Sequence, residues 1–183
     1  MTDKLPDFTE TQLSSKTVYH GRLLHVLEDE VRLPDGKPAR REYILHPGAA
    51  AMVPFLDPDT VVLVRQYRYP LARHFYEIPA GKVDRGEEPL ATARRELREE
   101  CGYEAAEWRR LATIHPGIGY SNETIEFFLA QGLTHVGHAL DEGEFLEVIK
   151  VRFTEALDWV RDGKITDQKT VIGLLWADRF RRG

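Results

Sequence analysis

Three glutamates near the middle of the chain have a spacing that could hold a metal ion. Glu96, Glu99 and Glu100 lie within PLATARRELREEC, residues 89–101. If this segment is a helix, residues three or four positions apart share one face, so the carboxylates form one stripe. Their repulsion costs roughly 0.2–0.5 kcal/mol per pair, and a hard divalent cation would turn it into attraction. Oxygen ligands favour Mg²⁺ or Mn²⁺ over zinc, although the spacing alone also suits an ordinary solvated helix face.

The residues around the glutamates predict the helix that would position them. Pro89 suits the first turn, and Gly102 suits the position after the last helical residue, where a positive φ is common. Leu, Ala, Arg and Glu, which fill the interval, are good helix formers. A second stripe of the same helix is apolar and is expected to face the core: Leu90, Ala93, Leu97 and Cys101.

Strand-like runs precede and follow this helix. The first 15 residues are polar and are expected to form a loose tail. Short strands are expected at 17–24, 25–33 and 39–45 in a small antiparallel sheet, and then at 49–55, 60–69, 108–114, 124–131 and 145–153. A short segment, 75–81, leads into the helix. Two C-terminal helices are expected, with Thr154 and Asp167 as their N-caps. This interleaving of strands and helices predicts a mixed α/β layer fold.

Composition excludes several classes of protein. The 25 Lys and Arg against 30 Asp and Glu give a net charge of −5, so a broad nucleic-acid-binding face is not expected. No apolar run is long enough for a membrane span, and no secretory h-region is found at the N-terminus. The single cysteine, Cys101, makes no internal disulfide, which favours the reducing cytoplasm. No GxSxG, P-loop or HxxxH pattern occurs, so serine, P-loop and zinc hydrolysis are not expected.

The spacing around the helix matches a known motif. A glycine, five residues, a glutamate, seven residues and then Arg-Glu-aliphatic-x-Glu-Glu-x-Gly form the Nudix box. The matching residues are Gly81, Glu87, Arg95, Glu96, Leu97, Glu99, Glu100 and Gly102. A chance match is on the order of one in 10⁸ per window at average composition. From about Gly48 to its C-terminus the chain therefore resembles the Nudix hydrolases, although Tyr103 stands where the box usually ends in an aliphatic residue.

The resemblance implies a fold and a set of metal ligands. The fold is the Nudix α/β fold, in which a mixed β-sheet is sandwiched between helices (α/β/α), here with a small N-terminal antiparallel sheet. Members cut the pyrophosphate of a nucleoside diphosphate linked to another group, with Mg²⁺ or, as a substitute, Mn²⁺. Glu96 and Glu100 would be the main metal ligands, Glu99 would complete the acidic set, and the carbonyl of Ala80 would contribute. Arg95 would orient the glutamates. Bound metal would neutralise charge on the diphosphate and lower the pKa of an attacking water.

Features outside the box resemble the ADP-ribose pyrophosphatase and nucleotide-sugar diphosphatase branch. They are VRQYRYPLARHFYEIPAGKVDRGEE, His115-Pro116-Gly117, the acidic segment DEGEFLEVIKV and the strand-rich N-terminus. In that branch the N-terminal region exchanges between subunits. We therefore expect residues 1–46 to be a tail and β-sheet region that forms a homodimer, and residues 47–183 to be the hydrolase domain.

Candidate substrate contacts follow from charge and from the same resemblance. Arg41 and Arg68 could bind the diphosphate, because a guanidinium can bond phosphate oxygens in pairs. Glu77 could bond ribose or base, as its counterpart does in the branch, and Glu42 is a weaker candidate. Adenine would stack on an aromatic ring, for which Tyr19, Tyr43 and Phe8 remain open choices.

The acidic segment supplies the candidate general base. Glu144 matches the position that related enzymes use, and Gly143 beside it would let the loop move over substrate. Glu142 is expected among the substrate-binding residues, and Glu142 or Glu99 is the alternative base. A carboxylate can take a proton at neutral pH from water that a metal has made acidic.

The sequence therefore predicts a Mg²⁺-dependent enzyme that hydrolyses ADP-ribose, or a related ADP-sugar, to AMP and ribose 5-phosphate. The small-molecule partner would be a nucleoside diphosphate-linked compound, with no nucleic-acid or membrane partner. GDP-mannose or another nucleotide sugar is the nearest alternative substrate, since the box binds the diphosphate and not the base. A non-catalytic Nudix module that senses a nucleotide is the alternative from another class; all box carboxylates are present, which disfavours it.

Overall fold

The computed structural model describes residues 5–137, 143 and 145–181. Clustering of contacts separates the chain into two compact units. One comprises Met1–His46 and Gly117–Glu123, and the other comprises Pro47–Pro116 and Thr124–Gly183. The assignment of residues 1–46 and 47–183 to separate domains stays a prediction.

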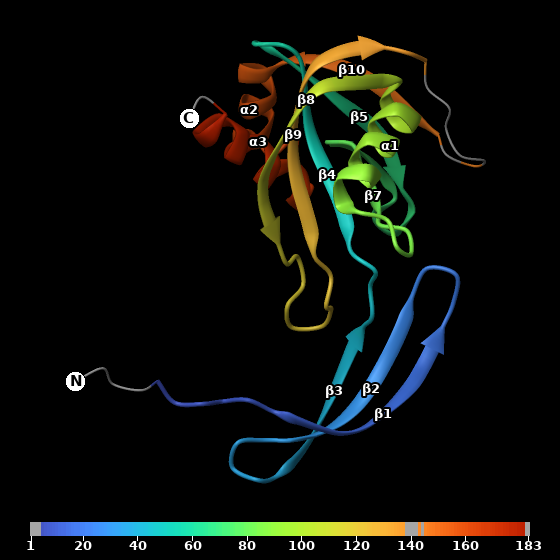
Figure 1. Ribbon diagram of the computed structural model, residues 1–183, viewed down its shortest axis with the longest axis vertical. Helices are drawn as coiled ribbons and strands as arrows, with labels where there is room; N and C mark the ends of the chain where they lie inside the picture. The colour runs from blue at the N-terminus through green and yellow to red at the C-terminus, as the bar shows by residue number, and fades with distance from the viewer. Residues whose placement is uncertain (1–4, 138–142, 144, 182–183) are drawn as a thin grey trace. The chain divides into compact units, whose positions relative to one another are not determined.

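The N-terminal unit contains a three-stranded antiparallel sheet in the order β1-β2-β3 (Figure 1). Its strands are β1 (Thr11–His20), β2 (His25–Arg32) and β3 (Pro38–Ile44). The predicted tail of 15 residues is wrong, because β1 already begins at Thr11. All ten residues of β1 are exposed. A strand with no buried face has no need for alternating apolar residues. Its sequence therefore lacks the apolar–polar alternation by which strands are usually predicted.

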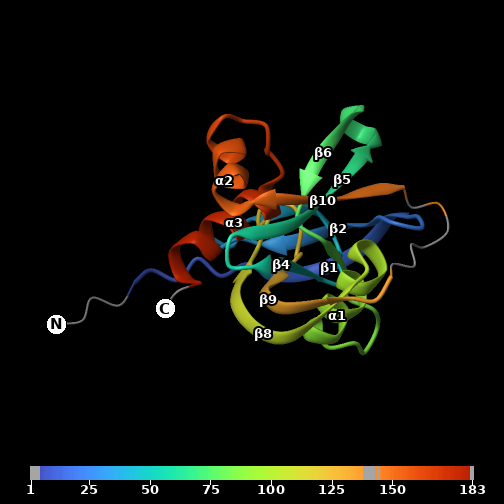
Figure 2. The same cartoon turned by 90° about the horizontal axis from the view of Figure 1, so that it is seen from above.

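The second unit is built on a mixed sheet in the order β10-β5-β4-β9-β8, with β6 paired to β5 and β7 to β4. Its strands are β4 (Ala49–Asp57), β5 (Thr60–Arg68), β6 (Arg73–Glu77), β7 (Ala80–Lys82), β8 (Tyr103–Ile114), β9 (Ile125–His135) and β10 (Leu146–Arg152). Strands β4 and β9 run parallel, whereas the other paired strands run antiparallel. The hairpin of β5 and β6, joined by the 3₁₀ turn η1 (Tyr69–Leu71), projects from the sheet in Figure 2.

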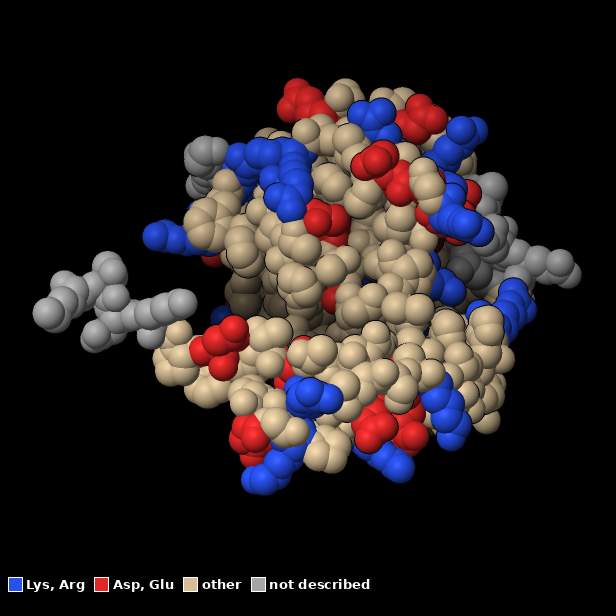
Figure 3. All heavy atoms as spheres, turned by 60° about the horizontal axis from the view of Figure 1, so that its bottom comes forward, with Lys and Arg blue, Asp and Glu red and all other residues tan. Residues whose placement is uncertain are grey.

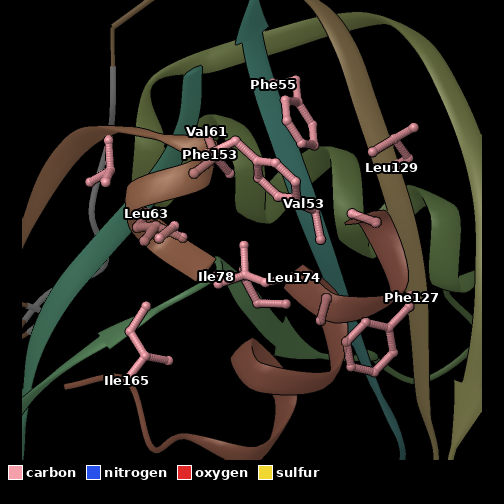
Figure 4. Packing of buried hydrophobic residues seen from close by; sticks show 14 of the residues in the cluster. Val53, Phe55, Val61, Leu63, Ile78, Phe127, Leu129, Phe153, Ile165 and Leu174 are labelled. Carbon is pink, nitrogen blue, oxygen red and sulfur yellow. The ribbon is translucent and has the colours of Figure 1, made fainter. Parts of the chain in front are cut away.

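Helices cover both faces of this sheet (Figure 1). Successive residues of a strand point to opposite faces, and β4 shows this directly. Ala50 and Met52 pack in the cluster that contains the apolar stripe of α1 (Pro89–Cys101). Val53 and Phe55 pack in the other cluster, with residues of α2 (Phe153–Arg161) and α3 (Gln168–Phe180), as Figure 4 shows. The predicted α/β/α arrangement with a small N-terminal sheet is confirmed.

In the second unit, the N-cap of α3 agrees with the sequence prediction, whereas the start of α2 and the start of β8 differ from it. Helix α3 is capped as predicted, since the Asp167 carboxylate accepts from the Thr170 backbone N–H at 3.0 Å. Thr154 is not the N-cap of α2, because the helix begins at Phe153 and Arg152 precedes it. Strand β8 begins at Tyr103, five residues before the predicted start. The strand therefore follows directly after Gly102, the glycine that ends α1, and its first residue, Tyr103, is buried.

Charge is mixed over the surface seen in Figure 3, where Lys and Arg side chains are interspersed with Asp and Glu. In the described part of the chain, no helix combines the length and the hydrophobicity that crossing a bilayer would require.

Candidate active site

Helix α1 begins and ends at the predicted residues. Pro89 opens it, and Gly102 follows it with a φ of 73°, where its N–H bonds the Arg98 carbonyl at 2.9 Å. Ala93, Leu97 and Cys101 are buried against the sheet. Burial raises the pKa of the Cys101 thiol well above its usual value, so Cys101 is a core residue without nucleophilic character. The buried stripe fixes the rotation of the helix and, with it, the direction of the acidic stripe.

Arg95 joins three glutamates of the box. Its Nη1 donates to Glu96 Oε1 at 2.7 Å and to Glu99 Oε2 at 3.0 Å. Its Nε and Nη2 donate to the two oxygens of Glu87 at 3.3 and 3.2 Å. Thr92 Oγ1 also donates to Glu87, at 2.7 Å. The hydrogen bonds from Arg95 and then Thr92 lower the pKa of Glu87 to about 2. Glu87 therefore holds the guanidinium that bridges Glu96 and Glu99.

Glu100 lies on the buried edge of the acidic stripe, with 6% of its surface exposed. The Ala80 N–H donates to Glu100 Oε2 at 3.2 Å, which ties the start of β7 to α1. The next residue, Gly81, lies even closer to the helix. A Cβ at position 81 would stand 1.8 Å from Glu96 Oε1, so any other residue here would displace the Glu96 carboxylate.

The donor set on α1 and β7 suits a hard divalent cation. It consists of carboxylate oxygens from Glu96, Glu99 and Glu100, together with the carbonyl of Ala80, and contains no sulfur or imidazole. Among residues 5–137, 143 and 145–181, no three acidic, histidine or cysteine side chains converge closely enough to form a ready-made metal site. Arg95 Nη1 bonds both Glu96 and Glu99, so these two carboxylates already share one cationic group. The chemistry of the donors fits, and the assignment of ligands stays a prediction.

Arg68 and Glu77 lie together in a second cluster of charges. Arg68 Nε and Nη2 donate to the two oxygens of Glu77 at 2.7 and 2.6 Å. Glu77 also accepts from Lys169, whose Nζ bonds Asp167 Oδ2 at 2.9 Å. Burial alone would raise the pKa of Glu77, but Arg68 and Lys169 lower it more, so the carboxylate is ionised. Arg68 and Glu77, both predicted to contact substrate, therefore bond each other. Each could contact substrate only while it remains part of this cluster of charges.

A cavity of about 420 Å³ adjoins this cluster. Its lining combines the four charged residues with apolar side chains: Arg68, Pro70, Leu71, Phe75, Glu77, Thr166, Asp167, Gln168 and Lys169. The sequence analysis did not identify Lys169. The only local signal was the helix N-cap two residues earlier, and the partner of Lys169 lies 92 positions away in the chain.

Arg41 and Glu42 belong to the N-terminal unit, on β3. Arg41 donates to Glu10 through Nε at 2.9 Å, and both Arg41 and Glu42 are exposed. On the same strand, the Tyr43 hydroxyl donates to Asp29 Oδ2 at 3.3 Å. The roles of Arg41 and Glu42 as substrate contacts stay predictions, and so does the choice of the aromatic ring.

The predicted base Glu144 and its neighbour Glu142 lie outside the described residues. Gly143 between them has a φ of 88°, a conformation that favours glycine. The assignment of Glu144 as base stays a prediction.

Comparison with known proteins identifies the family. The NUDIX domain matches residues 45–171, and the nucleoside diphosphate sugar hydrolase N-terminal domain matches residues 10–44. A protein of Bacillus methanolicus named methanol dehydrogenase activator is 38% identical over 169 residues, which cover 91% of each chain. The ADP-ribose pyrophosphatase of Bacillus subtilis is 36% identical over 167 residues, which cover 90% of each chain.

A solved structure, the crystal structure of an ADP compounds hydrolase, superposes with a TM-score of 0.87. It covers 98% of each chain at 24% identity, which shows the same fold. The chain therefore belongs to the Nudix family, and its predicted identification as a Nudix pyrophosphohydrolase is confirmed.

Proposed function

We propose that the chain hydrolyses the pyrophosphate bond of ADP-ribose, or of a related ADP-sugar, with Mg²⁺ and releases AMP and ribose 5-phosphate. The observation that carries this proposal is the acidic face of α1, on which Arg95 bonds Glu96 and Glu99 while Glu100 reaches the start of β7. The name of the Bacillus subtilis relative supports ADP-ribose as the substrate. Hydrolysis of a nucleotide-sugar diphosphate is the broader activity of which this is one case.

The residues of α1 and β7 would hold the cation. Glu96 and Glu100 are its main ligands in this proposal, with Glu99 and the carbonyl of Ala80 completing the set. A bound divalent cation supplies charge neutralisation at the diphosphate and makes water more acidic. Arg95 keeps Glu96 and Glu99 side by side through its two bonds from Nη1. This order is set before substrate binds, so little reorganisation is needed during the reaction.

The remaining residues would handle the substrate and the proton. Arg68 and Arg41 donate to the diphosphate oxygens. Glu77 and Glu42 contact the ribose or the base, and Glu142 is a further contact to the substrate. Glu144 takes one proton from the attacking water. The water oxygen then bonds to one phosphorus, the bond from that phosphorus to the bridging oxygen breaks, and the bridging oxygen leaves on the other phosphate. The products are two phosphate monoesters.

A comparison of substrates tests this function. We expect Mg²⁺-dependent release of AMP from ADP-ribose, with kcat/KM at least about tenfold above those for ADP-glucose, GDP-mannose and NADH. A tenfold preference for GDP-mannose would instead assign the chain to the alternative substrate. Binding of ADP-ribose without any release of AMP would identify a sensing module and reject the enzyme.

The N-terminal sheet supports a second part of the proposal, that the protein acts as a homodimer. Strand β1 exposes its whole length, including Leu13, Val18 and Tyr19. Small sheets are marginally stable unless one face is buried, so a second copy is a natural partner. We expect a dimer in sedimentation at micromolar concentration. A stable, fully active monomer would contradict a role for residues 1–46 in dimerisation.

The reducing cytoplasm remains the proposed location because Cys101 is unpaired.

A further inference from the structure

Lys169 neutralises a carboxylate that is almost fully buried. The Glu77 side chain is 3% exposed and that of Lys169 is 16% exposed, and the two form an ion pair. Lys169 is held in turn by Asp167, whose carboxylate caps α3 through the Thr170 N–H. A carboxylate at this depth is strongly disfavoured unless cations and hydrogen bonds surround it. Lys169 is thus one of two cations that allow Glu77 to remain charged.

The other cation, Arg68, is bound by one edge only. Its Nε and Nη2 bond Glu77, and its side chain is 45% exposed. Within the described part of the chain, Nη1 of Arg68 has no hydrogen-bond partner. The hydrogen bonds to Glu77 raise the pKa of Arg68 more than partial burial lowers it, and the charges of Asp167 and Glu100 add to this effect. Arg68 therefore lies within electrostatic reach of the acidic face of α1, with one edge fixed and the other available.

We propose that Lys169 is a positioning residue for the hydrolysis proposed above: it keeps Glu77 charged, so that Glu77 holds one edge of Arg68 and leaves the other edge for the substrate diphosphate. Lys169 itself does not touch substrate. Since a guanidinium matches phosphate oxygens in pairs, a change in its orientation weakens binding of the ground state and the transition state alike. The inference rests on the proposed function, because it assigns Arg68 to the diphosphate.

The charges around Glu77 set the expected pH dependence. Arg68 from β5 and Lys169 from α3 face the carboxylate, while Asp167 shares Lys169 and Glu100 acts on Arg68. Without Lys169, burial weighs more heavily and the pKa of Glu77 rises. Glu77 then takes up a proton at a higher pH than in the wild type, and Arg68 loses its charged partner there. The effect of losing Lys169 should therefore increase as the pH falls.

The Lys169→Met variant tests the proposal through kinetics. At pH 6 we expect KM for ADP-ribose to rise about tenfold while kcat stays within about twofold, and the increase in KM to be smaller at pH 8. Lys169→Arg should restore KM to within about threefold of the wild type. Lys164→Met is the matched control: it removes the same charge from a lysine that lies over the Trp159 ring and is not bonded to Glu77. An unchanged KM, a fall in kcat as large as the rise in KM, or an equal effect in Lys164→Met would overturn the proposal.

A second set of variants removes the buried charge together with its partner. Glu77→Gln and the double variant Glu77→Gln with Lys169→Met should have the same KM, because Lys169 acts only through Glu77. The double variant also avoids an uncompensated buried carboxylate, so it should fold even if Lys169→Met does not. If the two substitutions raise KM by independent factors, Lys169 acts on the substrate directly and the proposal is wrong.

Unfolding experiments separate this inference from the proposed function. A carboxylate with a lowered folded pKa stabilises the protein above its ordinary pKa, and this contribution is lost as the pH falls through the folded value. In Lys169→Met the buried carboxylate has a folded pKa above its ordinary value, so its ionised form destabilises the fold. The deficit in Tm relative to Lys164→Met should therefore be largest at pH 8 and shrink as the pH falls to 5, with no substrate present. If the wild type does not hydrolyse ADP-ribose, the proposed function fails while this difference persists. A difference in Tm between the two variants that is absent or does not change with pH would overturn the role of Lys169 itself.

Discussion

Glu100→Gln should lower kcat for ADP-ribose about 1000-fold at saturating Mg²⁺, because a cation at a diphosphate contributes several kcal/mol to the transition state. The substitution removes the charge of the most deeply buried carboxylate of the acidic stripe. A glutamine retains one acceptor oxygen for the Ala80 N–H, so the contact between α1 and β7 should persist. Steady-state kinetics and Mg²⁺ titration calorimetry measure the two consequences, slower turnover and weaker binding of the cation.

Glu88→Gln is the matched control for this variant. Glu88 precedes the first residue of α1, is exposed, and makes no capping hydrogen bond through its side chain. The same change of charge at the other end of the helix should leave kcat within about twofold. If Glu100→Gln kept a tenth or more of the wild-type kcat, Glu100 would not be a main metal ligand.

Glu144→Gln is expected to lower kcat about 100-fold or more, the usual contribution of a general base. The variant should fold normally and bind Mg²⁺ as the wild type does, because Glu144 is not among the proposed ligands. The rate that remains should lose the acidic limb of its pH profile, since the group that must be deprotonated is gone. Measurements of kcat between pH 5.5 and 9, together with Mg²⁺ titration, check these expectations.

Glu142→Gln separates the two candidate bases. It removes a carboxylate two positions away in the same acidic segment and should change KM more than kcat, in keeping with a substrate contact. A loss of kcat in Glu142→Gln, with near-normal turnover in Glu144→Gln, would transfer the role of base to Glu142. Near-normal turnover in both variants would leave Glu99 as the candidate.

Local signals made the helix of the box predictable. Pro89 and Gly102 fix its two ends because each has a conformational preference that does not depend on the rest of the fold. The Asp167 cap was predictable for the same reason. The spacing of Glu96, Glu99 and Glu100 determines their common face once the helix exists. These features need only neighbouring residues, so the sequence contains all the information for them.

Long-range contacts explain what the sequence did not reveal. The pairing of Glu77 with Lys169 joins residues 92 positions apart, and no local pattern distinguishes Lys169 from a solvated lysine. Strand β1 was missed at its start because pairing with β2 holds it through its backbone while its side chains remain exposed. Thr154 has the right side chain for a cap, yet α2 starts two residues earlier than that cap would allow, at Phe153, which packs in the core.

The short run Glu77–Gly81 is anchored on both faces of the sheet. Its first part is bonded to α3, through Lys169 and through the Ile78 N–H to Thr170 Oγ1 at 2.9 Å. Its last part is bonded to α1 through the Ala80 N–H. Inserting or deleting even one residue here would shift one anchor relative to the other, because the N–H of Ile78 and the N–H of Ala80 are only two positions apart. In natural relatives the separation of the glutamate and the box glycine should therefore stay fixed at four.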